Sequence, residues 1–313
     1  MIDMHVHVWD EGYQPLGYKM GMARGVASRR FPPRDPLTIL PRVMQGASDP
    51  EGVLLMQEME HSDVDAVVAM TVDMGVAFKE EQETPPEAVI EHHAELIRRY
   101  PGKFFAFFGM DPRRASTPAV FRRAMDEWGF KGLKLYPACG FSVVDEACLP
   151  LIEGCVERGV PILVHTAHVA PPLRPDLARP AAVSQIAAKY PEATLIYGHA
   201  GYRYWWEEAL QVSRSHTSSY LEISQWTEEA HRNPELFINV LSEMRDTIGA
   251  HRMLLGTDFA AGPVTAERGE YPRLMEFMRT LPEQAARYGK VFTQEETDLI
   301  TDGNARRLLK LQE

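Results

Sequence analysis

The chain has 313 residues, of which 45% are hydrophobic and 25% charged, a composition typical of soluble globular proteins. Its net charge of −11 argues against general binding of nucleic acids or membrane surfaces, because both need a basic face. Local arginines can still bind a small anionic substrate. No apolar stretch approaches the roughly 20 residues of a membrane helix, and no secretion signal opens the chain. We therefore expect a cytoplasmic protein with a small-molecule partner.

Short apolar runs alternate with amphipathic segments along the chain. Strands are expected near residues 2–8, 65–71, 103–109, 131–136, 161–166, 194–199, 218–223 and 252–257. Helices are expected near 51–62, 86–100, 117–128, 146–158, 180–190, 203–214, 234–247 and 271–287. This alternation predicts an α/β fold, a (β/α)8 TIM barrel in a single domain of residues 1–313, with its site at the C-terminal ends of the strands. An open doubly wound sheet is the alternative, but no Gly-x-Gly-x-x-Gly follows the first strand.

The connection at about residues 10–50 breaks the alternation. It is rich in Gly, Pro and Arg, and connections of this length are either functional or disordered. Because it leaves the strand that carries His5 and His7, we predict a loop insertion that covers the site. A surface excursion or an oligomer contact is the alternative interpretation.

Ionisable side chains lie near the ends of five expected strands. They are His5 and His7 in the first strand, Lys134 in the fourth, His165 in the fifth, His199 in the sixth and Asp258 in the eighth. Such groups are costly to bury unless they are paired. A barrel would bring all six to one rim, where imidazoles and a carboxylate suit Zn²⁺ with one position open for water. The sequence therefore predicts a metal site at this rim.

Five motifs resemble the amidohydrolase superfamily. They are Asp3-x-His5-x-His7, Val164-His165-Thr166, Gly198-His199-Ala200-Gly201, Gly256-Thr257-Asp258-Phe259 and the terminal segment 303–309. The chain is most similar to the amidohydrolase-related branch, which contains metal-dependent hydrolases and the aminocarboxymuconate-semialdehyde and resorcylate decarboxylases. The resemblance implies His5, His7, His165 and Asp258 as metal ligands. It also implies that His199 assists the water or the substrate and that Asp258 accepts the proton of the attacking water.

Lys134 allows three interpretations. In two-metal members of the superfamily a lysine of the fourth strand is carboxylated and bridges both ions. The ammonium could instead hold a substrate carboxylate, or it could pair with a neighbouring acid. The resemblance favours one divalent ion, expected to be zinc, with two ions only if Lys134 is carboxylated. A homodimer is compatible with the resemblance.

The leading hypothesis is a hydrolase of an amide, lactone or ester bond in a small anionic substrate. Asp258, His199 and Lys134 would be its catalytic residues. Arg203, Tyr202 and Arg24 would bind an anionic or aromatic part of the substrate. The alternative is a non-oxidative decarboxylase of an aromatic or unsaturated acid, built on the same ligands. A third possibility is a barrel whose metal site only stabilises it or binds a ligand.

Overall fold

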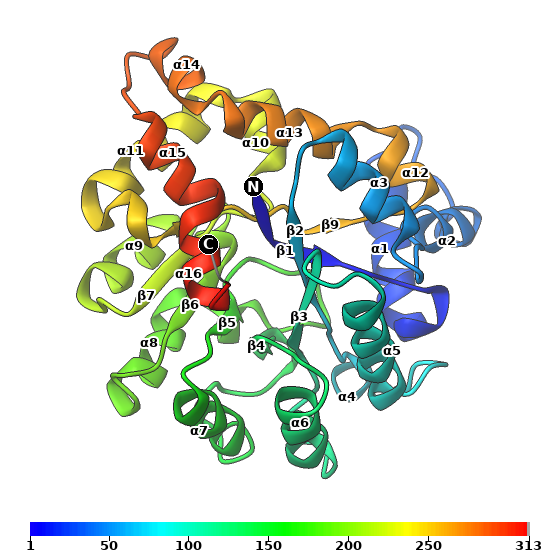
Figure 1. Cartoon of the computed structure of the whole chain (residues 1–313). Coiled ribbons are helices and arrows are strands. Elements are labelled where there is room, and N and C mark those ends of the chain that lie inside the picture. The colour runs from blue at the N-terminus through cyan, green and yellow to red at the C-terminus, as the bar shows by residue number, and fades with distance from the viewer. Residues whose placement is uncertain (312–313) are drawn as a thin grey trace.

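The computed structural model describes residues 1–311, apart from the side chain of Met44. One curled sheet lies inside a ring of helices (Figure 1). Its strands are β1 (Ile2–His7), β2 (Ala66–Met70), β3 (Phe104–Phe108), β4 (Gly132–Leu135), β5 (Ile162–His165), β6 (Leu195–Gly198), β7 (Ser219–Glu222), β8 (Met253–Leu254) and β9 (Phe259–Ala260). Their order is β8-β7-β6-β5-β4-β3-β2-β1-β9, and all neighbouring pairs are parallel.

The sheet closes into a barrel through residues 253–260. β8 pairs with β7, and β9 pairs with β1. Between these two short strands the Met4 amide donates to the Leu255 carbonyl at 2.9 Å, and the Asp258 amide donates to the His5 carbonyl at 2.8 Å. β8 and β9 are thus two halves of one strand, interrupted where Asp258 adopts a φ of 61°. The predicted TIM barrel is confirmed, with an eighth strand broken at Asp258.

Helices surround the strands in the predicted alternation. Those that correspond to predicted helices are α3 (Val53–His61), α5 (Pro86–Arg99), α6 (Thr117–Asp126), α7 (Leu149–Arg158), α8 (Pro180–Lys189), α9 (Trp206–Ser215), α11 (Pro234–Ile248), α13 (Glu270–Arg279) and α14 (Leu281–Ala286). Further helices are α4 (Gly75–Phe78), α10 (Thr227–Arg232), α12 (Pro263–Glu267), α15 (Gln294–Asp298) and α16 (Asn304–Leu309). At the start of α11 the Asn233 side chain accepts from the Leu236 amide, and Pro234 stands where a helix needs no N–H donor.

The interior of the barrel is closed at the end opposite the site. Ile2 and Ala66, near the starts of their strands, share a buried apolar cluster with Ala305 and Leu309 of α16. The Asn304 side chain ties this helix to the barrel, because its amide donates to the carbonyls of Ala250 and Met253, both at 2.8 Å. Helix α16 therefore covers the N-terminal ends of the strands, and a site can form at their C-terminal ends.

Residues 10–50 differ from the expected irregular loop. They fold into α1 (Leu16–Ser28) and α2 (Pro36–Gln45). Ala23 and Ala27, four residues apart, are both buried on one face of α1, which is the spacing of a helix packed on one side. The insertion is therefore helical. The assignment of residues 1–313 to one domain stays a prediction. Among the described helices, none is both long and apolar enough to cross a membrane.

Candidate metal centre and active site

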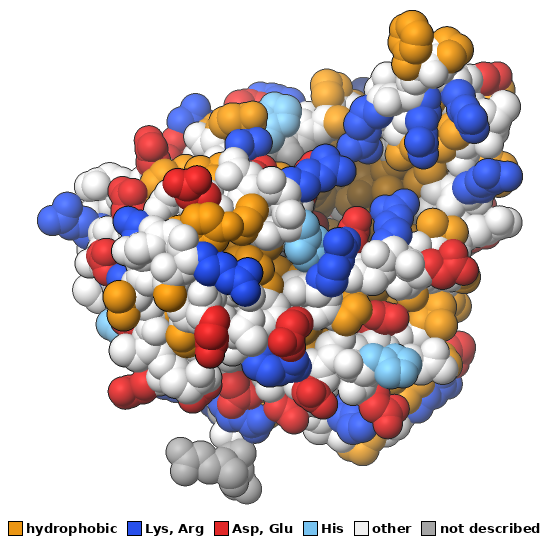
Figure 2. Space-filling model, turned by 90° about the horizontal axis from the view of Figure 1, so that it is seen from above, with side chains coloured by type: hydrophobic (Ala, Val, Ile, Leu, Met, Phe, Trp, Pro, Cys, Tyr) orange, Lys and Arg blue, Asp and Glu red, His pale blue; other side chains and the backbone are white. Residues whose placement is uncertain are grey.

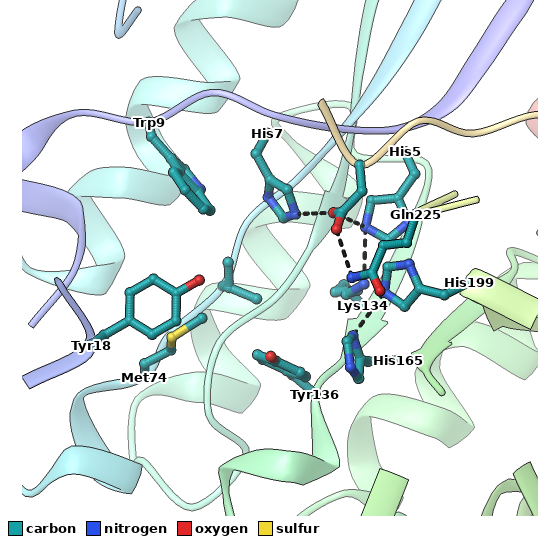
Figure 3. Close-up of a pocket in the computed structure, with 12 residues that line it drawn as sticks. His5, His7, Trp9, Tyr18, Met74, Lys134, Tyr136, His165, His199 and Gln225 are labelled. Atoms are coloured by element: carbon teal, nitrogen blue, oxygen red, sulfur yellow. Dashed lines mark hydrogen bonds and ion pairs between the residues drawn. The ribbon is translucent and has the colours of Figure 1, made fainter. Parts of the chain in front are cut away.

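The barrel brings the six predicted ionisable residues to one cavity of about 110 Å³. Figure 3 shows the labelled ones, His5, His7, Lys134, His165 and His199, gathered around one space. The six residues are His5 and His7 of β1, Lys134 of β4, His165 of β5, His199 just after β6 and Asp258 between β8 and β9. Because parallel strands end at the same rim, residues far apart in the sequence meet there.

Asp258 and His199 connect the cluster. Asp258 Oδ1 lies 3.0 Å from His7 Nε2 and 3.4 Å from His5 Nε2. His199 Nε2 lies 2.8 Å from His165 Nδ1. Donor atoms of His5, His199 and Asp258 all lie within 4.8 Å of one another. This group of three includes His199, which the sequence analysis expected beside the metal ligands and not among them. His7 contacts Asp258, and His165 contacts His199.

The protonation states suit a metal. Burial lowers the pKa of His5, His165 and His199 well below its usual value, so these rings are neutral at pH 7. Burial opposes ionisation of Asp258, but the His7 hydrogen bond and the neighbouring histidines lower its pKa well below the ordinary range. Neutral imidazole nitrogens beside an ionised carboxylate are the donor set that Zn²⁺ and similar divalent ions bind. The residues present therefore fit a divalent cation.

Glu222, at the end of β7, holds His5 from behind and was not predicted. Its Oε2 accepts from His5 Nδ1 at 2.9 Å, and the carboxylate is fully buried. Hydrogen bonds from Ser224 also reach it, while burial raises its pKa to about 7. Gly256 faces this carboxylate so closely that a Cβ would lie 2.0 Å from Glu222 Oε1. The only sequence signal was an acid at the end of the short strand Ser219–Glu222.

Lys134 adds a buried amine to the cluster. Its Nζ lies 3.2 Å from His5 Nε2. Burial lowers its pKa to about 8, although the negative charges of Asp258 and Glu222 act to raise it. The amine is thus close enough to the cluster to act on a bound substrate.

Gln225 is a second residue that sequence reasoning missed. It follows β7 with a φ of 66°, and its Nε2 donates to Asp258 Oδ2 at 2.8 Å. This bond occupies Oδ2 of Asp258, while Oδ1 faces His5 and His7. An uncharged amide in a loop gave no signal in the sequence.

Aromatic side chains form the wall opposite the cluster (Figure 3). Trp9 and Tyr18 meet edge to face with ring centroids 6.4 Å apart. The Tyr136 ring lies 4.4 Å from the His165 ring. Trp9 Nε1 is buried without a hydrogen-bond partner within residues 1–311. This wall can hold a flat ring and offer it a donor.

The predicted substrate-binding residues lie farther out. Tyr202 and Arg203 line a neighbouring cavity of about 410 Å³, and Arg203 Nη1 pairs with Glu229 Oε1 at 3.0 Å. Arg24 is exposed on α1 and does not contribute to the catalytic cavity. Figure 2 shows a hollow in the surface with Lys and Arg side chains beside it. The role of these three residues in binding stays a prediction.

Comparison with known proteins gives the family and the fold. The model of the family described as Amidohydrolase matches residues 2–311. An uncharacterised TIM-barrel protein of Bordetella bronchiseptica superposes with a TM-score of 0.66 at 19% identity, over 99% of this chain and 98% of the other. A 5-carboxyvanillate decarboxylase of Novosphingobium aromaticivorans, complexed with manganese and 4-hydroxy-3-methoxy-5-nitrobenzoic acid, gives 0.64 at 14% identity, over 99% and 96%. A 2,6-dihydroxybenzoate decarboxylase of Rhizobium gives 0.64 at 14% identity, over 99% of both chains. No curated protein matches the chain significantly.

These comparisons correct the leading functional hypothesis. The expected hydrolysis of an amide, lactone or ester bond is contradicted, because the similar structures with a named reaction include several decarboxylases of aromatic acids. The family supports an enzyme with a divalent metal. Zinc is not confirmed, since two of the similar decarboxylases contain manganese.

Proposed function

The chain belongs to the amidohydrolase family, and we propose that it is a metal-dependent, non-oxidative decarboxylase of an aromatic hydroxy acid. The observation that carries this proposal is the wall of Trp9, Tyr18 and Tyr136, which faces the imidazole and carboxylate cluster across a small cavity. A planar acid packed on this wall would present its carboxylate to the cluster. The decarboxylases among the similar structures support the same reaction class.

Four residues would hold one divalent ion: His5, His7, His165 and Asp258. When bound, the ion polarises the carboxylate of the acid and its neighbouring oxygen. Manganese is our first choice, in view of the similar structures. His199 would stand beside these ligands, as the resemblance implies. The Ser224 hydroxyl contacts its Nδ1 at 2.6 Å, and its Nε2 lies 2.8 Å from His165 Nδ1.

The reaction needs a proton as well as a ligand set. The bond between the ring carbon and the carboxyl carbon breaks, its electron pair stays on the ring, and a proton replaces the departing CO₂. We assign this proton to Lys134, which is the only Lys or Arg lining the catalytic cavity within the described residues. Before the bond breaks, the same ammonium would offset the negative charge of the substrate.

The test is release of labelled CO₂. The purified chain, loaded with Mn²⁺ or Zn²⁺, is given carboxyl-labelled 2,6-dihydroxybenzoate, 5-carboxyvanillate and related hydroxybenzoates, with chelator-treated protein as the control. We expect metal-dependent release from at least one acid. A parallel panel of amides, lactones and esters should stay intact. Turnover of that second panel without any CO₂ from the first would overturn the proposal.

A further inference from the structure

A second cavity of about 350 Å³ adjoins the catalytic one and is about three times larger. Tyr18, Tyr136, His165 and Gln225 line both cavities. The two cavities therefore lie next to each other at these four side chains.

Helix α1 supplies one wall of the second cavity. Gly21 and Gly25, one helical turn apart, both line it. A Cβ built at either position would meet no atom within 4 Å. By contrast, a Cβ at Gly17 of the same helix would lie 2.8 Å from the Phe78 ring, so close packing explains that glycine. Glycine weakens a helix at both Gly21 and Gly25. Close packing within the protein does not explain why glycine stands at either position.

The remaining walls are apolar, with a cation at the rim. Phe78, Val169 and Leu173 face the space from other elements. Arg29 lines it from the C-terminal end of α1, where its Nε donates to the Gly25 carbonyl at 3.1 Å. No acidic side chain within residues 1–311 forms an ion pair with Arg29. Its outer N–H groups are free to bind an anion.

We propose that the second cavity binds an apolar arm of the aromatic acid and that Arg29 binds a carboxylate at the end of this arm. The inference rests on the proposed decarboxylase and names its substrate class, a hydroxybenzoate with an arm that ends in an anion. The arm packs against Gly21 and Gly25, where a larger side chain would fill the space. Burial of each methylene of the arm then strengthens binding.

The test uses three probes: 2,6-dihydroxybenzoate, the same acid with a butyl arm, and the same acid with a 3-carboxypropyl arm. Each arm is placed at ring carbon 3 and, separately, at ring carbon 4. Dissociation constants come from calorimetry on the metal-loaded chain, and labelled CO₂ is followed in parallel. We expect the butyl arm to tighten binding roughly tenfold or more. The terminal carboxylate should add about another fivefold to tenfold through Arg29.

Variants show which residues bind the arm. For each variant, the dissociation constant of the probe with an arm is compared with that of the probe without it. Gly25→Phe fills the cavity and should abolish the gain from the butyl arm. Its matched control is Ser28→Phe, since Ser28 is exposed on the same helix and outside the cavity lining. Arg29→Met should abolish only the gain from the carboxylate. Arg34→Met, at an exposed arginine just beyond α1, should keep the wild-type ratios.

The outcomes separate this inference from the proposed function. An arm that gives no gain in affinity, or a gain that survives Gly25→Phe, overturns the second cavity as a substrate site. Release of CO₂ from the unsubstituted acid would still support the decarboxylase in that case. Conversely, arm-dependent binding that Gly25→Phe removes, without CO₂ from any acid, sustains the binding site and overturns the proposed reaction.

Discussion

Glu222 accepts a hydrogen bond from His5 Nδ1 at 2.9 Å, and both side chains are fully buried. A carboxylate that accepts from the far nitrogen of a metal-binding histidine sets its tautomer and raises its basicity. Glu222→Gln keeps the size and removes the charge. We expect metal affinity to fall roughly 10- to 100-fold with the fold intact, as measured by competition titration of Mn²⁺ against a chelator and by circular dichroism.

The matched control is Glu229→Gln, which changes another buried carboxylate, the one paired with Arg203. That variant should bind Mn²⁺ like the wild type. Equal Mn²⁺ affinities of Glu222→Gln and the wild type would show that His5 keeps its orientation without the carboxylate.

Lys134 separates a one-metal site from a two-metal site. Its Nζ lies 3.2 Å from His5 Nε2, and in the proposed reaction it would offer a proton or a positive charge to the substrate. Lys134→Met should therefore lower the rate of CO₂ release by roughly 100-fold or more, which is typical for loss of an acid–base group. Metal analysis should still find one ion per chain. A fall from two ions to fewer would instead identify a carboxylated, bridging lysine.

The sequence predicts an element well when its buried residues are strongly hydrophobic, and poorly when they are small. β3 (Phe104–Phe108) is apolar throughout and fully buried, so its run of hydrophobic residues predicts it directly. α1 carries three glycines together with Lys19 and Arg24, a composition that suggests a loop. Its packing depends on two small residues, Ala23 and Ala27, that give little hydrophobic signal.

The site follows the same logic. Histidines after apolar strands stand out, and the sequence therefore predicted which residues meet at the rim. Glu222 did not stand out, because an acid after a short strand is indistinguishable from a solvated strand end until its burial is known. The position of the Gln225 side chain results from a positive φ at this residue. A positive φ is uncommon for residues other than glycine, so the sequence does not indicate it here.

Gly21 and Gly25 of α1 are positions where the helix is weaker than it needs to be. Both have helical neighbours and empty space where a Cβ would lie. Alanine at each position should raise the free energy of unfolding by ~0.5–1 kcal/mol, because it restricts the unfolded chain without a clash. Urea denaturation measures the change. A loss of stability in either variant would mean that the glycine has a structural role that its surroundings do not reveal.

At the scale of the whole molecule, charge is unevenly distributed. The chain carries a net charge of −11, yet residues 14–48 contain six Lys or Arg and a single acid, Asp35. This segment forms α1 and α2 and supplies part of the wall of the second cavity. It therefore opposes the negative field of the rest of the molecule next to the site, which would favour the anionic substrate that we propose.

The stability of the whole molecule should depend on pH through His93 of α5. This histidine is 1% exposed, its Nδ1 contacts the Val89 carbonyl at 2.8 Å, and its Nε2 has no partner within the described residues. Burial lowers its pKa to about 4, below the value near 6.5 of an unfolded chain. The folded state therefore favours the neutral ring. Its stabilisation is complete above about pH 6.5 and is lost as the pH falls toward 4.

The loss amounts to about 3 kcal/mol between these two pH values, since each pKa unit corresponds to ~1.4 kcal/mol. Urea denaturation at pH 7 and at about pH 4.5 measures it. His93→Leu cannot titrate, so its unfolding free energy should change less between the two pH values than that of the wild type. His61→Leu, at an exposed histidine, is the control and should keep the wild-type change. If His93→Leu loses as much stability in acid as the wild type does, the acid sensitivity arises from other groups, and His93 is already hydrated in the folded protein.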